Sequence, residues 1–381
     1  MLLERDILNG PDLTFKNKIL SINWFFVLVL CCIASVGFLM LYSAADGHID
    51  PWAKPQMVRF SSGLIAMLMI AMVDLRVWLR HAYILYFTAL ALLTAVEFVG
   101  FIGMGAQRWI DLGYISLQPS ELMKITIILA LARYFHTHSF EDIEKPYFLF
   151  FPLAIIGAPA ALILRQPDLG TTLMITAAGF AILFLAGVKI WMFATVGLSG
   201  LIAAPVAWQF LHEYQQKRIL TFLNPETDPL GAGYHIIQSK IALGSGGFSG
   251  KGFMQGPQSH LRFLPEMQTD FIFTMLAEEF GFVGGIGLIV LYSFLIITGI
   301  VIALRARSQF GRLVAGGVVA TFFLYVFINI AMVMGLIPVV GVPLPLISYG
   351  GTAMMTLMFG FGFLLGVHVH RDLIIPRLDE S

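Results

Sequence analysis

The chain has 381 residues, of which 58% are hydrophobic and only 12% are charged. Soluble domains carry about 25% charged residues, so the composition excludes an ordinary soluble protein and indicates an integral membrane protein. Its 23 basic residues balance 23 acidic ones, which argues against nucleic acid as a partner. The cysteines, Cys31 and Cys32, are adjacent in an apolar run and cannot form an ordinary disulfide.

The first apolar run follows a polar segment, residues 1–22, which is predicted to be a cytoplasmic arm. No small-residue cleavage site follows this run, so we interpret it as a retained span and not as a signal peptide. Further runs near the ~20 residues that cross a bilayer recur along the chain. Together the runs lie at about 23–43, 57–73, 81–104, 121–135, 147–164, 171–187, 190–210, 281–304, 313–337 and 349–368.

This pattern predicts an all-α integral membrane protein with about ten transmembrane helices. Helices 1–7 occupy 23–210, a large extracytoplasmic loop spans 211–269, residues 270–370 form a re-entry helix and helices 8–10, and 371–381 form a cytoplasmic tail. Residues 270–304 are too many for one span, because at ~1.5 Å per residue they reach about 50 Å. The glycines from Gly281 to Gly287 predict a bend or break there.

Lysine and arginine in the short loops set the orientation. They are concentrated on the side that holds Arg76, Arg80, Arg133, Lys145 and Arg305. That side is predicted to be cytoplasmic, with both termini inside. The loops predicted to face outward are 105–120, 165–170, 211–269 and 338–348.

The unusual polar residues gather on the predicted outer side. An outward-facing polar cleft in an apolar bundle is the default functional site of a membrane protein. Cytosolic nucleotide is not expected to reach such a site. Its candidate residues are Arg108, Glu121, Lys124, Arg165, Asp168, Asp270 and the turn from Ser348 to Gly351.

Glu121 and Lys124 follow a Pro-Ser helix start, and their i,i+3 spacing places them on one helix face. They form either an ion pair that lets two charges lie at the membrane edge or a pair that positions a polar substrate head group. Arg165 and Asp168 lie in the turn RQPDLGTT. Asp168 either caps the next helix, holds an arginine that clamps phosphate oxygens, or binds a divalent ion. Arg108 either anchors the interface or contacts phosphate.

Asp270 is the sharpest candidate, at the point where the large loop re-enters the membrane. Glu266, Glu278 and Glu279 lie on the same stretch, and a lipid-facing segment would not hold so many acids. Thr269 and Asp270 either form a helix cap and first-turn acid, or Asp270 is a general base that deprotonates a sugar hydroxyl.

The glycine-rich loop at 244–252 and the histidines give weaker functional signals. The loop GSGGFSGKG, residues 244–252, departs from a phosphate loop at Ser245 and Gly252, so we interpret it as a backbone segment of close approach and expect no nucleotide. No metal-spaced cysteine or histidine motif occurs. His136 and His138 are expected in a solvated cytoplasmic loop.

Four motifs together resemble the SEDS family of bacterial membrane proteins (shape, elongation, division and sporulation). The resemblance runs in order along nearly the whole chain, and the segment 335–351 is most similar to the rod-shape branch of the family. The motifs are QRWIDLGYISLQPSELMK (107–124), RQPDLGTT (165–172), LPEMQTDFIFTMLAEEFG (264–281) and PLISYGGTAM (345–354).

The resemblance implies a peptidoglycan glycosyltransferase that polymerises lipid II at the outer face of the cytoplasmic membrane for elongation and rod shape. It places Asp270 on the family's essential aspartate, and it implies a class B penicillin-binding protein and the elongation machinery as partners. Arg108, Lys124, Arg165 or a divalent cation (Mg²⁺ or Mn²⁺) can compensate the leaving pyrophosphate. The sequence identifies no protein ligands for such an ion.

Two other functions remain open at this point. A lipid II flippase would also have a polar cleft and intramembrane charges, although it would need access from both sides. A scaffold whose large loop docks a partner would tolerate the replacement of Asp270 or Glu121 without loss beyond stability.

Overall fold

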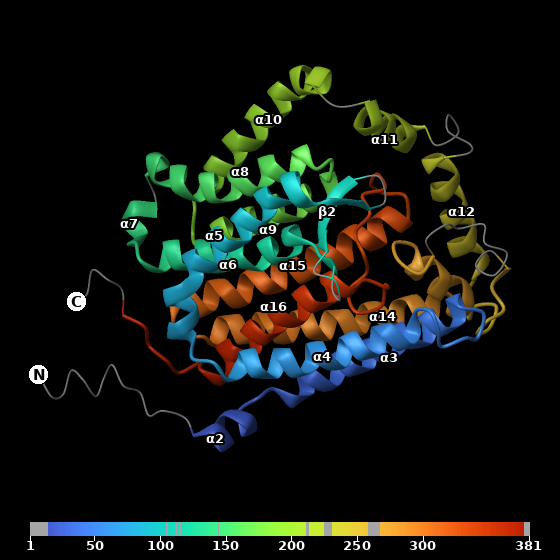
Figure 1. The fold of residues 1–381 in the computed structure, drawn as a ribbon, viewed down its shortest axis with the longest axis horizontal. Coiled ribbons are helices and arrows are strands. Elements are labelled where there is room, and N and C mark those ends of the chain that lie inside the picture. The colour runs from blue at the N-terminus through green and yellow to red at the C-terminus, as the bar shows by residue number, and fades with distance from the viewer. Residues whose placement is uncertain are drawn as a thin grey trace, which may run out of the picture.

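The structure, a computed structural model, describes residues 14–376 apart from 104–105, 112, 114–115, 144, 211–212, 225–230 and 258–266. Glu266 and most of the predicted N-terminal arm therefore lie outside the described residues. Long helices run along the longest axis of the molecule and form a bundle (Figure 1). Seven described helical segments are long and apolar enough to cross a membrane. They are α3 (Trp24–Ala44), α4 (Ala53–Met72), α5 (Leu75–Val99), η1 with α8 (Pro146–Leu149, Phe150–Arg165), α14 (Ile272–Arg305), α15 (Gln309–Val333) and α16 (Gly351–Val369).

Three further helices coincide with predicted apolar runs: α6 (Pro119–His136), α9 (Leu169–Leu185) and α10 (Ile190–Phe210). The predicted all-α membrane fold is confirmed. Most of α10 has exposed side chains, and the helix stands off from the bundle (Figure 1). Shorter helices complete the described chain: α2 (Phe15–Leu20), α7 (Phe140–Ile143), α11 (Glu213–Leu223) and α12 (Ala232–Ser245).

Two sequence predictions were wrong in detail. The third span was placed at 81–104, but α5 begins at Leu75 and ends at Val99. The chain then forms a small antiparallel sheet of three strands in the order β1-β2-β3; the strands are β1 (Phe101–Gly103), β2 (Ala106–Asp111) and β3 (Ser116–Leu117). His136 does not lie in a solvated loop, because it ends α6 and is only 3% exposed.

The core of the bundle lies where α14, α15 and α16 meet α3. Aromatic edges hold these helices together: the ring centroids of Phe26 and Phe361 are 5.3 Å apart, and those of Phe361 and Phe322 are 5.2 Å apart. Tyr292 is fully buried on α14, and its hydroxyl donates to the Pro345 carbonyl at 2.6 Å. Such a buried hydroxyl needs a partner, so this bond fixes the segment before α16 to the core.

The two ends of the bundle differ. The helices α2 and α7 and the end of the described chain lie at one end, and the small sheet and α12 lie at the other (Figure 1). The basic residues that set the predicted orientation belong to the first end. The candidate site residues belong to the second.

The helix α14 breaks at Gly281, as the sequence predicted, with a backbone φ of 65° that favours glycine. The break separates the carbonyls of Glu278 and Glu279 from the amides of Phe282 and Val283, which would be their partners in an unbroken helix. The loop 244–252 satisfies all four groups. It donates from the Lys251 and Gly252 amides to Glu278 and Glu279 at 3.0 Å each, and it accepts from Phe282 and Val283 through the carbonyls of Gly247 and Phe248 at 2.9 and 3.1 Å.

The side chains of the two glutamates are fully buried at this break. Lys251 contacts the Glu278 carboxylate at 3.3 Å, and Ser43 donates to the Glu279 carboxylate at 2.5 Å. A buried carboxylate without partners would be costly. These contacts therefore fasten both the loop and α3 to the short helix of residues 272–280.

We expect Gly250→Ala to destabilise the protein by about 1–3 kcal/mol. A Cβ at Gly250 would collide with the Glu279 carbonyl, and the residue has a φ of +80°. Gly247→Ala is the matched control, because Gly247 also has a positive φ, of +56°, but open space around its Cβ. Thermal unfolding of the two variants checks the prediction. Equal losses would show that backbone strain, and not the docking of the loop, determines the effect.

Candidate functional site

A buried charge network lies at the start of α6. Lys124 donates to the Glu121 carboxylate at 2.7 Å, and Tyr325 of α15 donates to its other oxygen at 2.9 Å. Lys124 also contacts the Tyr325 hydroxyl. Glu121 and Lys124 are 5% and 3% exposed, so this is a paired, desolvated group and not a surface ion pair.

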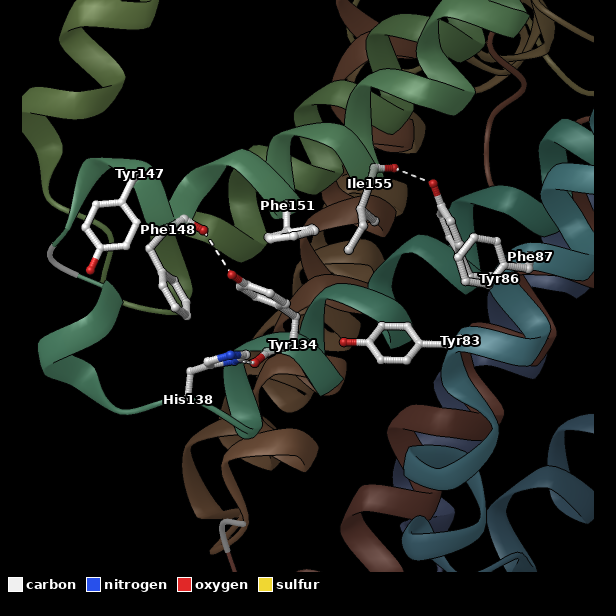
Figure 2. A pocket seen from close by; sticks show the side chains of 9 residues that line it. All are labelled: Tyr83, Tyr86, Phe87, Tyr134, His138, Tyr147, Phe148, Phe151 and Ile155. Carbon is white, nitrogen blue, oxygen red and sulfur yellow. Dashed lines mark hydrogen bonds between the residues drawn. The ribbon is translucent and has the colours of Figure 1, made fainter. Parts of the chain in front are cut away.

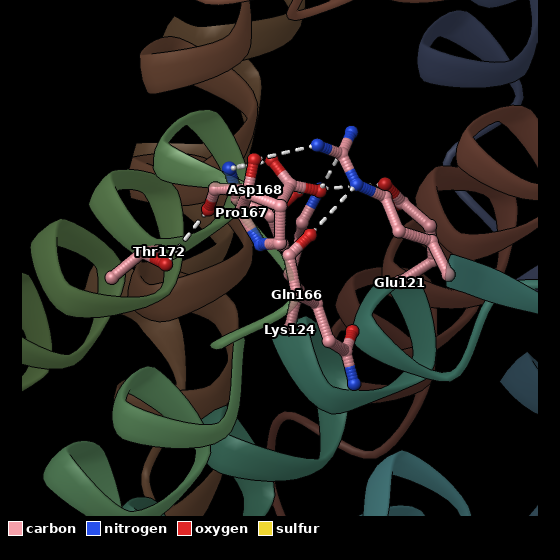
Figure 3. A network of polar contacts seen from close by, with 8 residues as sticks. Glu121, Lys124, Gln166, Pro167, Asp168 and Thr172 are labelled. Atoms are coloured by element: carbon pink, nitrogen blue, oxygen red, sulfur yellow. Dashed lines mark hydrogen bonds and ion pairs between the residues drawn. The ribbon is translucent and has the colours of Figure 1, made fainter. Parts of the chain in front are cut away.

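A second network joins β2 to the turn before α9 (Figure 3). The Arg108 guanidinium donates to the carbonyls of Gln166 and Pro167 at 3.2 and 2.7 Å, and it lies 3.5 Å from the Asp168 carboxylate. Asp168 also caps α9, accepting from the Thr171 amide at 3.0 Å. The helix-cap interpretation of Asp168 is therefore confirmed, and the same carboxylate orients an arginine.

Arg165 is not part of this network. Its side chain is exposed, and it makes no hydrogen bond or ion pair with the part of the chain that the structure describes. From the sequence, Arg165 and Arg108 were equally good candidates for a phosphate contact. In the structure Arg108 is held in place by backbone carbonyls, and Arg165 remains accessible.

Asp270 is held by the backbone on both sides. Ser348 donates to the Thr269 carbonyl at 2.5 Å, the Tyr349 amide donates to the Gln268 carbonyl at 2.8 Å, and Asn329 donates to the carbonyl of Asp270 itself at 3.0 Å. All three bonds are accepted by backbone carbonyls of residues 268–270. The helix α14 begins at Ile272 and its N-cap, Phe271, makes no side-chain cap bond. The alternative in which Thr269 caps a helix starting at Asp270 was therefore wrong.

Ser348 and Asn329 each make two contacts here. The Ser348 hydroxyl also accepts from the Leu344 amide at 2.7 Å, and the Asn329 amide also donates to the Val342 carbonyl at 2.7 Å. Both residues thereby tie the segment 338–348 to the entry of α14. Ser348 was predicted to bind substrate, but its hydroxyl proton is given to the Thr269 carbonyl.

The Asp270 carboxylate and the charged networks converge on the same segment. A Cβ at Gly341 would lie 3.4 Å from the Asp270 carboxylate, and a Cβ at Gly170 would lie 2.6 Å from the Val340 carbonyl. Val340 and Gly341 thus separate Asp270 from the α9 turn that carries Asp168. On α15, Tyr325 and Asn329 are four residues apart and share one face, so the helix links the Lys124 network to Asp270.

Sequence reasoning missed Tyr325 and Asn329. Asn329 is fully buried in an apolar helix, and a polar residue within a membrane span is costly unless it is paired. The i,i+4 spacing of these two polar residues inside the apolar run FLYVFINIAMV (323–333) is the sequence signal for this pair.

We expect Asn329→Leu to lower activity and to destabilise the protein. It would leave the carbonyls of Asp270 and Val342 without this donor, and an unpaired buried group such as the Val342 carbonyl costs about 1–3 kcal/mol. Thr321→Val is the matched control on the same helix, because Thr321 is also buried but bonds only its own helix, at Gly317. Thermal unfolding and turnover are measured for both. An unaltered Asn329→Leu protein would show that this anchor does not position Asp270.

The fold and site define a multi-pass membrane protein whose buried charges gather at one end of the bundle, beside a helix that breaks at its entry. The family model of the FtsW, RodA and SpoVE cell cycle proteins matches residues 20–373. The chain therefore belongs to this family, the SEDS proteins.

Relatives and solved structures agree over most of the chain. It is 44% identical to the peptidoglycan glycosyltransferase MrdB of Escherichia coli over 96% of this chain and 98% of that protein. A chain of a peptidoglycan synthase complex, described as coordinating polymerization and crosslinking, matches with a TM-score of 0.79 and 33% identity over 92% of this chain and 98% of that one. The rod-shape-determining protein RodA of Thermus thermophilus matches with a TM-score of 0.70 and 28% identity over 92% and 98%.

Proposed function

We propose that the protein is a peptidoglycan glycosyltransferase that polymerises lipid II for cell elongation, with Asp270 as the general base. Membership of the family and the names of the MrdB and RodA relatives support the activity. The observation that carries the assignment of the base is the fastening of Asp270. Its backbone is held by Asn329, Ser348 and Tyr349, which fixes its carboxylate against Gly341, on the segment that also contacts the turn before α9.

The proposed reaction is a direct displacement with inversion. The Asp270 carboxylate takes the proton of the acceptor 4-hydroxyl as that oxygen attacks C1 of the lipid-linked N-acetylmuramic acid. The bond between C1 and the pyrophosphate oxygen breaks, and undecaprenyl pyrophosphate leaves with the electron pair. One acidic base suffices for such a step, and no glycosyl-enzyme forms.

The cations of the site divide into two roles. Arg165 is exposed, and the Arg108 side chain is 29% exposed, so both can meet the negative charge that develops on the leaving pyrophosphate. Lys124 is buried between Glu121 and Tyr325. We assign it a positioning role, in which it holds the start of α6 and the facing side of α15 in register.

A divalent cation, if one takes part, is proposed to be held mainly by the pyrophosphate. The described residues contain no group of three or more His, Cys, Asp or Glu side chains that could hold a metal ion. No step of the proposed reaction runs through such an ion.

The orientation and partner follow from the same proposal. The basic residues at the α7 end support, by the positive-inside rule, a cytoplasmic position for that end and a site that faces outward in the cytoplasmic membrane. The structural relative belongs to a complex that couples polymerization to crosslinking. We therefore infer that a class B penicillin-binding protein supplies the transpeptidase, within the elongation machinery.

Reconstitution separates the enzyme from the lipid II flippase. The protein and its partner are placed in vesicles with lipid II, and the transpeptidase is blocked with a β-lactam so that only glycan chains are scored. We expect chain formation by the wild-type protein. Transport of lipid II across the vesicle membrane without chain formation would overturn the proposal in favour of the flippase.

A further inference from the structure

A cavity of about 540 Å³ lies between α5, α6 and α8, at the end of the bundle opposite the candidate site (Figure 2). This volume is in the range of about 300–1,000 Å³ that ligand pockets occupy. The walls are almost wholly aromatic and aliphatic. The lining residues are Tyr83, Tyr86 and Phe87 of α5, Tyr134 and His138 at the end of α6, and Tyr147, Phe148, Phe151 and Ile155 of η1 and α8.

Two of the four tyrosine hydroxyls in these walls bond backbone carbonyls (Figure 2). Tyr86 donates its hydroxyl proton to the Ile155 carbonyl at 3.0 Å, and Tyr134 donates to the Phe148 carbonyl at 3.0 Å. The His138 ring packs on Phe148, with centroids 4.6 Å apart. With walls that are mainly aromatic and aliphatic, the cavity suits a flexible apolar chain.

Two arginines lie at the Tyr83 side of this apolar space. The Arg133 guanidinium lies 4.5 Å from the centroid of the Tyr83 ring and donates to the Arg80 carbonyl at 2.7 Å. Arg80 is exposed and lies one helical turn before Tyr83 on α5. Lys145 also lies at this end, but Asp142 pairs with it at 2.8 Å. Arg80 and Arg133 thus provide positive charge beside the cavity.

We propose that this cavity binds one acyl chain of an anionic phospholipid, whose phosphate is held by Arg80 and Arg133. Aromatic and cationic side chains are typical of the level of the membrane where lipid headgroups meet acyl chains. A chain entering the cavity would bridge α5, α6 and α8. The undecaprenyl chain of the substrate is several times larger than an acyl chain and fits the volume less well. This inference concerns a site away from Asp270, so it stands independently of the proposed reaction.

The test is binding of defined lipids to the purified, delipidated full chain, measured by native mass spectrometry in detergent. Phosphatidylglycerol is compared with phosphatidylcholine of the same acyl chains. At about 1 kcal/mol for each cation near an anionic headgroup, two arginines predict a preference for phosphatidylglycerol of roughly tenfold or more. Equal binding of the two lipids would overturn the proposal.

Three variants locate the bound lipid. Ile155→Trp fills the cavity and is expected to lower phosphatidylglycerol binding at least about tenfold, whereas Ile84→Trp, at a position 61% exposed on α5, is expected to leave it unchanged. The double variant Arg80→Gln/Arg133→Gln is expected to lose the headgroup preference.

A control variant shows whether the headgroup preference depends on these two arginines in particular. Arg305→Gln, which alters an exposed cation on α14, is expected to keep the preference. If Ile155→Trp unfolds, the comparison of the arginine variants decides alone. Unchanged binding in the arginine variant, or tighter binding of undecaprenyl phosphate than of phosphatidylglycerol, would contradict the assignment.

Discussion

Replacing Asp270 by asparagine is expected to abolish glycan polymerisation while the protein folds normally. The substitution removes the proton acceptor but keeps the shape of the side chain. General base catalysis contributes about 10²–10⁴-fold, and a loss of that size is expected in the rate of chain formation from purified lipid II. The bonds that fasten this segment run through backbone carbonyls and the side chains of Asn329 and Ser348, so Asp270→Asn leaves them in place.

The control for this result is Asp142→Asn at the opposite end of the bundle. Asp142 pairs with Lys145 in the segment after α6, and its replacement is expected to leave polymerisation unchanged. Normal polymerisation by a folded Asp270→Asn protein would remove the proposed base.

Lys124→Met is expected to destabilise the protein by about 3–5 kcal/mol, because breaking a buried ion pair leaves an uncompensated charge. Glu121 is 5% exposed, and Lys124 supplies its cation at 2.7 Å. Loss of turnover in this single variant therefore cannot separate a role in the reaction from a role in the fold. Thermal unfolding measures the stability part.

The double variant Glu121→Gln/Lys124→Met separates the two roles. Removing both charges eliminates the uncompensated carboxylate, and Tyr325 keeps a partner in the glutamine. We expect most of the lost stability to return, because a neutral pair of similar volume often replaces a buried ion pair without loss. Turnover that returns with stability supports the positioning role. Turnover that stays absent in a stable double variant would show that a charge of this pair acts in the reaction.

Much of the fold was predictable because membrane spans have a required length. Apolar runs of about 20 residues located the helices, and the excess length of 270–304 together with Gly281 located the break in α14. The sheet of β1 to β3 was not predicted, since its strands are at most six residues long and show no clear alternation. The end of α5 was misplaced because the apolar run continues from the helix into β1, so hydropathy alone does not mark where the helix stops.

The site was predictable in its members but not in its arrangement. Charged residues in or beside apolar runs identified Glu121, Lys124 and Asp168. Which arginine turns inward depends on the geometry of the turn after α8, where the Gln166 and Pro167 carbonyls receive Arg108 and Arg165 stays exposed. No spacing in the sequence encodes that choice. Likewise, the cavity beside Tyr134 is lined by three separate segments of the chain, so no single stretch of sequence predicts it.

The most direct test of Asp270 as the base is lipid II binding by Asp270→Asn, measured beside its turnover with the same partner. A general base acts on the transition state, so we expect the variant to bind lipid II with an affinity near that of the wild-type protein while turnover is lost. An affinity that falls in proportion to turnover would show that Asp270 binds the substrate and is not the base.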